Sequence, residues 1–515
     1  MNKTAPAAPS ALKLSTSRVL LHGALPGVMA GIMGGIAFGA SMIELGQLES
    51  IASLVRADSA AVAAMVHLAV SAAVGAVFGL LMFNQRATAG DTLVWGMVYG
   101  ALFWIVGPLT LRPLILGETV TWDVRTAHEF CGSLIGHVVW GAVTGLSLAA
   151  LRTVVAPWRA DGSDIGRGSN RTIRGRVMMA SIGMLAGLMS AVLLTLLLPD
   201  RNELTAPVAG SSSTDWLAVI AIGVVAGALY GILEPYSTSP QAPRLGARLV
   251  QGVALGYLAW IVVALTIIPL ADIDTLAWKA TPVRDRFEVF PGYLLLGALL
   301  VVLFCTISGG GRFLFTDQLR QYDRLMAGPQ RLRAATWGAF AGIVGGLLFT
   351  IIMVKVGALG RVSKLVGAQS SVVGFVVHMI IAVVIGGTYA LLFRRHSFDV
   401  RSGIGWGLSY GFLWWILGGL TLLPVLLGGS PEWSAAEAGR AFPSLVGHLV
   451  YGIALGVVFH LLEARYSPWW ITRSDIESDR TRARRQQVFT SAPALWAFSV
   501  FMSLFVVVVL ARIGP

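Results

Sequence analysis

The sequence predicts an all-α polytopic membrane protein that contains three tandem four-helix repeats, all pointing the same way, and one further C-terminal transmembrane helix. Three observations lead to this fold class: an apolar composition, a series of long apolar stretches, and a motif that occurs three times. Of the 515 residues, 56% are hydrophobic and 12% are charged, and the mean hydropathy is +0.74. A chain of this length and composition is not expected to fold as a water-soluble globule.

The apolar stretches are long enough to cross about 30 Å of hydrocarbon as helices that rise about 1.5 Å per residue. We expect thirteen spans in the sequence, at 20–43, 61–84, 92–116, 131–151, 178–198, 216–235, 249–271, 290–311, 335–357, 371–393, 402–427, 443–464 and 491–511.

The spans group into repeats that are separated by basic segments. We expect a cytoplasmic tail at 1–19, repeats at 20–155, 178–312 and 335–465, linkers at 156–177, 313–334 and 466–490, and a thirteenth helix within 491–515.

The repeats are predicted by a Trp-Thr-Pro-Trp motif with the same spacing in each copy. Its members are Trp104, Thr110, Pro113 and Trp122, then Trp260, Thr266, Pro269 and Trp278, then Trp415, Thr421, Pro424 and Trp433. Repeats 1 and 3 align without a gap at an offset of 311 residues, which pairs His67 with His378 and His137 with His448. Repeat 2 is degenerate, because Val219 and Tyr293 stand where the other copies have histidine. Self-similarity at a fixed period indicates duplication.

Charge placement predicts the orientation. The chain has a formal net charge of +12, and its arginines concentrate in the three linkers. Because positive residues near span ends remain in the cytoplasm, we expect the linkers and the amino terminus inside and the carboxyl terminus outside. An even number of spans per repeat makes the repeats parallel. The linkers are expected to attract anionic lipid headgroups, and no nucleic-acid-binding module is found.

Two histidines in each of repeats 1 and 3 are the candidate functional residues. With this topology His67 and His137 lie six or seven residues inside the outer surface, and Trp104 is expected in the same outer half of the membrane. His378, His448 and Trp415 repeat the arrangement. Two histidines on facing helices can ligate haem or another tetrapyrrole, or hold a metal with further ligands. They can equally contact a polar ligand or lipid headgroup, or form structural hydrogen bonds.

The other motif residues have structural interpretations. We expect Trp122, Trp278 and Trp433 to anchor the chain at the membrane interface. The prolines are expected to leave a carbonyl free, which a threonine or a ligand can engage.

The sequence contains no charged residue in the middle of a span, no phosphate-binding loop, no HExxH motif and no recognisable catalytic triad. This pattern disfavours an ion-driven pump and an enzyme, so no catalytic residue is assigned. The favoured function is a non-catalytic subunit or scaffold of a membrane complex, with partner subunits and with ligand sites in the outer leaflet. The alternative is a small-solute transporter or channel with a path through the pseudo-threefold arrangement.

A short motif also resembles a known family. Gly136-His137-Val138-Val139-Trp140 and Gly447-His448-Leu449-Val450-Tyr451 are similar to the Gly-His-Leu-Val-Trp segment in the last helix of the YagU-like inner-membrane proteins. The family also has a histidine in an earlier span, followed by a glycine-rich span that contains a proline. The residues of this chain that are similar to that pattern are His67, Gly96, Gly100 and Pro113. The resemblance implies a four-span unit, here fused three times, and a location in a bacterial inner membrane, and it suggests a link to acid tolerance.

Overall fold

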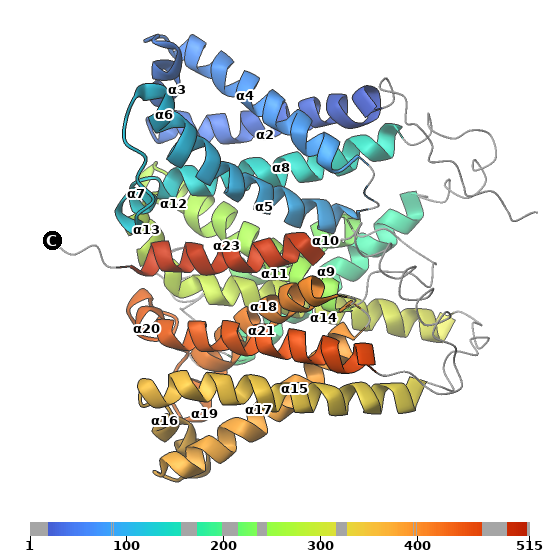
Figure 1. Cartoon of the computed structure of the whole chain (residues 1–515). Coiled ribbons are helices and arrows are strands. Elements are labelled where there is room, and N and C mark those ends of the chain that lie inside the picture. Colours follow the sequence, from blue (N-terminus) through green and yellow to red (C-terminus); the bar gives the residue numbers. More distant parts are fainter. Residues whose placement is uncertain are drawn as a thin grey trace, which may run out of the picture.

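The computed structural model describes residues 19–83, 85, 87–155, 173–197, 215–233, 245–315, 327–394, 396–397, 399–465 and 492–511. All regular secondary structure in these ranges is helical. The long helices run alongside one another, and Figure 1 shows short helices gathered at one end of them. The tail 1–19 lies outside the described residues except for Val19, and the linkers 156–177, 313–334 and 466–490 lie outside them for most of their length.

Twelve of the described helices are long and apolar enough to cross a membrane. An integral membrane protein therefore fits this fold. Five of these stretches combine more than one helical element. The twelve are Leu20–Glu44 (η1 and α2), Ala60–Leu81 (α4), Ala89–Leu116 (α5, η3 and α6), Cys131–Arg152 (in α8), Arg176–Leu196 (in α9), Leu245–Asp272 (α11, η6 and part of α12, Ile268–Ile273), Phe287–Gly309 (η7 and part of α14, Phe290–Phe315), Arg331–Lys355 (in α15), Ser371–Phe393 (α17), Val400–Leu426 (α18, η10 and α19), Phe442–Arg465 (α21) and Pro493–Leu510 (in α23).

The stretch expected at 216–235 is the one that is not among the twelve. It forms α10 (Asp215–Leu233), whose apolar part, Leu217–Leu233, is shorter than the others. The helix nevertheless lies along α9 (Ile173–Leu197). A Cβ at Gly187 would overlap the backbone of Gly223, so the two backbones approach closely without intervening side chains.

The long helices associate into groups around shared glycine contacts. In the first group, α2 (Leu25–Glu44) contacts α4 and α8, and α5 (Ala89–Val106) contacts α8 (Cys131–Val155). A Cβ at Gly96 would overlap the carbonyl of Gly141. In the last group, α15 (Ala327–Lys355) contacts α17 and α21, and α18 (Val400–Trp414) contacts α21. Small residues allow such close approach where no hydrophobic force drives helices together.

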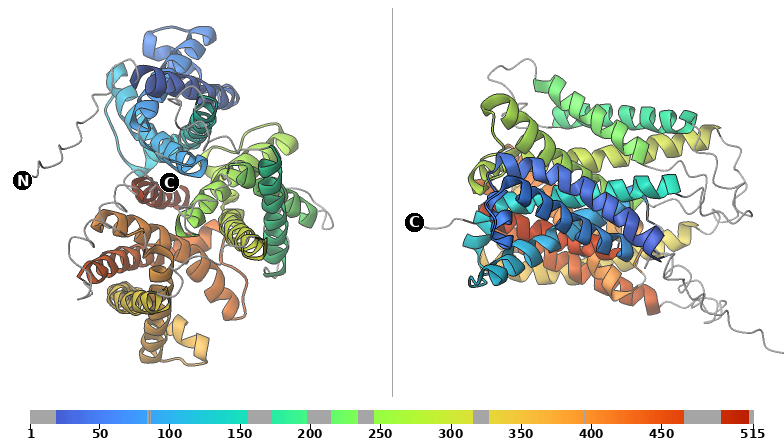
Figure 2. Two further views of the ribbon diagram at one scale, coloured as in Figure 1. Left: turned by 90° about the vertical axis from the view of Figure 1, so that its right-hand side faces the viewer. Right: turned by 90° about the horizontal axis from the view of Figure 1, so that it is seen from above.

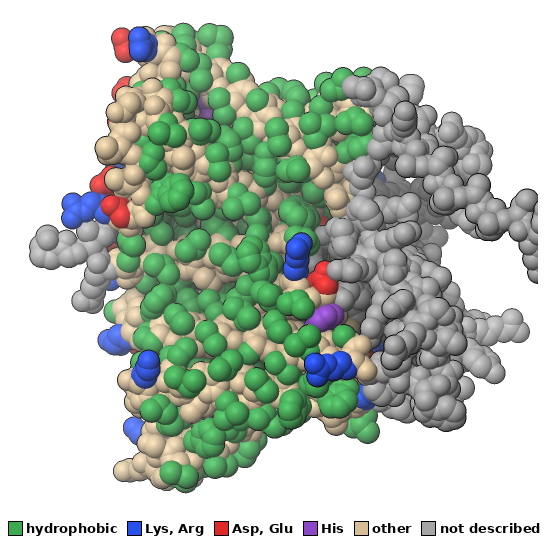
Figure 3. Space-filling model, viewed as in Figure 1, with side chains coloured by type: hydrophobic (Ala, Val, Ile, Leu, Met, Phe, Trp, Pro, Cys, Tyr) green, Lys and Arg blue, Asp and Glu red, His purple; other side chains and the backbone are tan. Residues whose placement is uncertain are grey.

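Short helices at the end seen on the left of Figure 1 connect neighbouring long helices. They are α3 (Glu49–Ala52), α7 (Val124–Glu129), α13 (Ala280–Asp285), α16 (Leu359–Ser363) and α20 (Ala435–Arg440), and the ends of two long stretches, α6 (Arg112–Leu116) and α19 (Leu423–Leu426), lie at the same end. Figure 3 shows apolar side chains over the middle of the face in view and charged side chains near its two margins. This distribution is that of a protein whose middle band contacts lipid.

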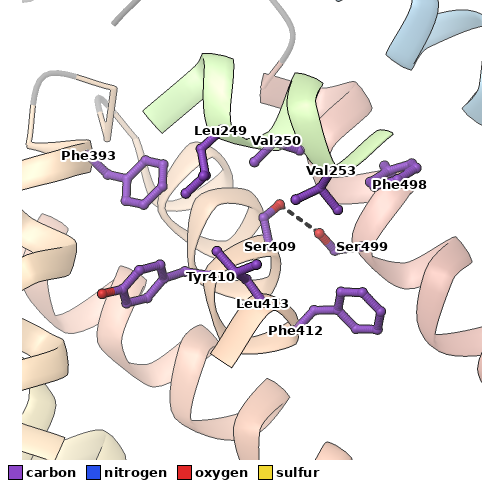
Figure 4. Close-up of a pocket in the computed structure, with 10 residues that line it drawn as sticks. All are labelled: Leu249, Val250, Val253, Phe393, Ser409, Tyr410, Phe412, Leu413, Phe498 and Ser499. Carbon is purple, nitrogen blue, oxygen red and sulfur yellow. Dashed lines mark hydrogen bonds between the residues drawn. The ribbon is translucent and has the colours of Figure 1, made fainter. Parts of the chain in front are cut away.

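Helix α23 (Ala492–Leu510) lies between the helix groups, as the end-on view in Figure 2 shows. It contacts both α5 and α18. Its Phe505 ring lies 5.4 Å from the Tyr257 ring of α11 (Leu245–Val262), measured between centroids. On the α18 side, the hydroxyls of Ser409 and Ser499 are 2.6 Å apart at a pocket of about 360 Å³ (Figure 4). Helix α11 contacts α14, which in turn contacts α9, so these helices and α10 form a middle group. One apolar helix, α23, therefore joins all three groups.

Candidate functional site

The third long stretch of each expected repeat contains a π-helical segment. These segments are η3 (Gly107–Leu111), η6 (Val263–Ile267) and η10 (Trp415–Leu422). In each one the motif threonine donates its hydroxyl to the carbonyl five residues earlier, at 2.7 Å for Thr110 to Ile105, 2.9 Å for Thr266 to Ile261 and 2.8 Å for Thr421 to Ile416. We expected a threonine or a ligand to engage the carbonyl that the proline leaves free, but the threonine bonds to a different carbonyl, eight residues before the proline. The carbonyls four residues before Pro269 and Pro424 accept the backbone N–H groups of Ala277 and Glu432 instead.

The second motif tryptophan donates its indole N–H to the same threonine. The distances from Nε1 to Oγ1 are 3.3 Å for Trp122 and Thr110, and 3.0 Å for both Trp278 with Thr266 and Trp433 with Thr421. Trp122 is 72% exposed, but Trp278 and Trp433 are 2% and 1% exposed. Two of the three expected interfacial anchors are therefore buried, and in these two the threonine supplies the partner that a buried indole N–H needs. The hydrogen bond alone does not bury the ring, because Trp122 forms it too.

The first motif tryptophan forms a second hydrogen bond within its own group. Nε1 of Trp104 donates to the carbonyl of Phe130 at 3.1 Å, and Nε1 of Trp415 donates to the carbonyl of Ala441 at 3.3 Å. Each acceptor directly precedes the next long helix, α8 or α21. Trp260 has the same relation to Arg286. The repeated motif thus ties the π-helical segment to the connecting loop and to the following helix.

His67 and His378 occupy equivalent environments on α4 and α17. Both are buried. Nε2 of His67 lies 2.9 Å from the carbonyl oxygen of Gly35, and Nε2 of His378 lies 3.1 Å from that of Gly346. A carbonyl oxygen only accepts a hydrogen bond, so the proton of each neutral imidazole is assigned to Nε2.

His137 on α8 and His448 on α21 have the opposite assignment. Nδ1 of His137 lies 2.7 Å from the carbonyl oxygen of Ser133, and Nδ1 of His448 lies 2.8 Å from that of Ser444. The proton of the neutral ring is therefore assigned to Nδ1. His137 is buried, whereas His448 is partly accessible.

A phenylalanine brings the two histidines of each group to one place. The ring centroid of Phe38 lies 5.5 Å from that of His67 and 4.9 Å from that of His137, both edge-on. Phe349 lies 5.3 Å from His378 and 4.8 Å from His448, also edge-on. The two histidines of a group therefore both pack against one phenylalanine ring, at distances that edge-to-face aromatic pairs favour.

The two tryptophans proposed for the site lie beside it to different degrees. A Cβ at Gly419 would stand 3.6 Å from both Cε1 of His448 and Cδ1 of Trp415, so these two rings border the same space. In the first group Phe103, the neighbour of Trp104, lies 5.8 Å from His137, measured between ring centroids.

One nitrogen in each ring is left without a hydrogen bond. Within the described residues, Nδ1 of His67 and Nε2 of His137 have no partner, and the same holds for Nδ1 of His378 and Nε2 of His448. In the assigned tautomers these nitrogens carry lone pairs, which can accept a hydrogen bond or coordinate a metal. No group of three or more histidine, cysteine, aspartate or glutamate side chains that could hold a metal occurs in the ranges that the structure describes.

Sequence reasoning missed the residues that organise this cluster. Phe38 and Phe349 are 311 residues apart, as are Ser133 and Ser444, so the gapless alignment contained the signal. The sequence-based prediction considered only the histidines and tryptophans at this offset, and so it did not include these phenylalanines and serines.

Comparisons with protein-family models, with curated proteins and with solved structures found no match to this chain.

Proposed function

We propose that this chain is a non-catalytic scaffold subunit of a bacterial inner-membrane complex, in which two histidine and phenylalanine clusters each hold a ligand. The observation that carries the proposal is the pair of imidazole nitrogens left without a partner in each cluster, at His67 with His137 and at His378 with His448. A hydrogen bond from the other nitrogen to a backbone carbonyl orients each ring. Histidines that ligate a metal are commonly oriented by such a hydrogen bond on the nitrogen that does not bind the metal.

The proposal includes three tandem parallel repeats and thirteen spans. The proposal is supported by hydrogen bonds and ring contacts that recur at an offset of 311 residues. For example, the bond between His67 and Gly35 recurs between His378 and Gly346. The Trp-Thr contact also recurs in the middle copy at Trp278. The thirteenth span would be α10, whose 19 residues extend about 28 Å at 1.5 Å per residue.

The orientation is proposed from the arginine-rich linkers, which would be cytoplasmic. The short helices α7, α13 and α20 would then lie at the outer surface, together with the end of α23. The histidine clusters would occupy the outer half of the membrane.

The geometry favours a small polar ligand, such as a lipid headgroup that donates hydrogen bonds, over a tetrapyrrole. Nε2 of His67 is already bonded to Gly35, and Phe38 contacts both imidazoles. Haem held between His67 and His137 would have to displace that ring, whereas a hydrogen-bond donor can approach the two lone pairs as they stand. The role of Trp415 would be to form an apolar wall beside His448, since its N–H is already bonded to a carbonyl. Trp104 makes the equivalent hydrogen bond but lines a separate groove against α23.

A transport path through the centre of the three groups has less support. Helix α23 fills that region with side chains that are 0% exposed, including Met502, Phe505 and Val509. The contacts of Phe505 with Tyr257 and Trp260 would have to separate for a solute to pass.

The test is to purify the full chain from its membrane, record its absorption spectrum, and identify co-purifying lipids and metals by mass spectrometry. We expect a bound polar lipid or small molecule that is reduced in His137→Phe and in His448→Phe and lost in the double variant. Phenylalanine keeps the ring and the contact with Phe38 or Phe349 while removing the lone pair. A strong Soret band in the wild type would show that the ligand is a tetrapyrrole, and equal ligand content in the double variant would refute the site.

A further inference from the structure

A lipid-facing groove lies between α5 and α23, apart from the histidine clusters. Its volume is about 540 Å³ and every side chain that lines it is hydrophobic. Trp104, Phe501 and Phe505 form buried walls, whereas Leu102, Trp496 and Leu504 on its rim are 52%, 45% and 51% exposed. The lining positions on α23 run from Trp496 to Val508, about 18 Å along the helix. The groove is therefore long, apolar and open toward the hydrocarbon.

The groove exists because one position in the first copy of the motif is small. Ala101 stands three residues before Trp104, and the same position holds Tyr257 before Trp260 and Phe412 before Trp415. Tyr257 contacts Phe501 and Phe505 of α23, and Phe412 lines the pocket between α18 and α23. Both aromatic residues fill space against α23 that Ala101 leaves empty.

One end of the groove lies near two basic side chains. Trp104 lines the groove, and its N–H bonds to Phe130, two residues after His128. Helix α7, which carries His128, and helix α13, which carries Arg284, both contact α23. His128 and Arg284 occupy the same motif position, 24 residues after Trp104 and Trp260.

These two side chains have no acidic partner. Arg284 is partly buried and forms no ion pair within the described residues, and Nε2 of His128 is buried without a hydrogen bond there. Burial, with a contribution from the positive charge of Arg284, holds the pKa of His128 below its usual value. The site presents uncompensated positive charge and an unused donor or acceptor at the membrane surface.

We propose that this groove binds an acyl chain of an anionic phospholipid, whose phosphate lies beside Arg284 and His128. An arginine can make paired hydrogen bonds to phosphate oxygens. The apolar side chains of the groove replace the contacts that the acyl chain makes with other lipids in the bilayer. The lipid would fill the gap between the first helix group and α23. This inference goes beyond the proposed function, because it uses none of the four clustered histidines.

The experiment measures phosphatidylglycerol binding to the full chain in detergent by native mass spectrometry. In Ala101→Phe, a phenyl ring enters the groove at the position where Phe412 already carries one, and we expect affinity to fall at least about tenfold. Ala497→Phe obstructs the groove from α23 and should have the same effect if Ala101→Phe folds poorly. Ala69→Phe is the matched control, because Ala69 is exposed on α4 outside the groove.

The headgroup is tested with a second pair of measurements. Arg284→Gln combined with His128→Gln should lower affinity for phosphatidylglycerol and leave that for phosphatidylcholine little changed. Arg440→Gln, an exposed arginine on α20, serves as the control. Inorganic phosphate in excess should not displace the lipid. Wild-type affinity in both groove variants, or equal affinity for the two lipids in the wild type, would overturn the proposal.

Discussion

Gly136 lies directly against the phenyl ring of Phe38, so that a Cβ at position 136 would overlap the ring; Gly447 has the same relation to Phe349. The glycine before each histidine therefore makes room for the ring that the histidine contacts. This relation explains the Gly-His pair of the motif by packing, and it makes the cluster sensitive to a single methyl group.

We expect Gly136→Ala to destabilise the protein by about 1–3 kcal/mol, the usual effect of overpacking a filled core. The measurement is thermal or denaturant unfolding in detergent. Gly360→Ala is the control, because a Cβ there meets nothing within 4 Å. Combining Gly136→Ala with Phe38→Leu should recover part of the loss, since the smaller side chain leaves room for the methyl group. Additive effects of the two substitutions would contradict this account.

The Trp-Thr contact offers a comparison between two copies of one motif. Thr421→Val removes the acceptor of the Trp433 N–H, which is buried, and should lower stability by about 1–3 kcal/mol. Thr110→Val should have a smaller effect, because Trp122 is 72% exposed and its N–H can bond to water. Unfolding of the two variants under the same conditions gives the comparison. An equal or larger loss in Thr110→Val would show that burial does not govern this hydrogen bond.

The imidazole assignments predict two different tautomers in one cluster. Nitrogen-15 spectra of the protein labelled in histidine should show the proton of His67 on Nε2 and that of His137 on Nδ1, because each of these nitrogens faces a carbonyl oxygen. Substituting each histidine with glutamine in turn assigns the signals. The same proton position in both rings would mean that one carbonyl contact is not formed, and would remove the pair of lone-pair nitrogens on which the ligand proposal rests.

The helices of this chain were largely predictable from its sequence, because long apolar stretches mark them directly. The stretch expected at 371–393 is the span Ser371–Phe393, and that expected at 131–151 is Cys131–Arg152. The nearness of His67 and His137 also followed from equal depth on two helices of one bundle. In both cases a local property of the sequence determines the outcome.

Features that depend on neighbouring helices were not predictable in this way. Burial of Trp278 and Trp433 depends on how the loops fold back onto the π-helical segments. Those segments in turn arise from a shift in backbone hydrogen bonding that apolar periodicity does not encode. The position of α23 between α5 and α18 is likewise set by side-chain contacts between distant parts of the chain.

The last prediction concerns α10, on which the number of spans depends. Its apolar part, Leu217–Leu233, is short, yet its backbone approaches α9 closely at Gly223. That contact would hold α10 along α9 as both cross the membrane, because a glycine at this position lets the two helix backbones pack closely. We therefore expect thirteen spans, with the two ends of the chain on opposite sides. Reporters fused after Leu233 and after Pro515 measure this directly.

A fluorescent protein that matures only in the cytoplasm should be bright after Leu233 and dark after Pro515, and a phosphatase active only outside should give the reverse pattern. The variant Gly223→Leu tests the helix contact itself, because the leucine side chain would separate α10 from α9. If that contact holds the span in place, the fluorescence after Leu233 should fall in this variant. A dark fluorescent reporter after Leu233 together with a bright one after Pro515 in the wild type would instead mean that α10 does not cross, which leaves an even number of spans and the end of α23 in the cytoplasm.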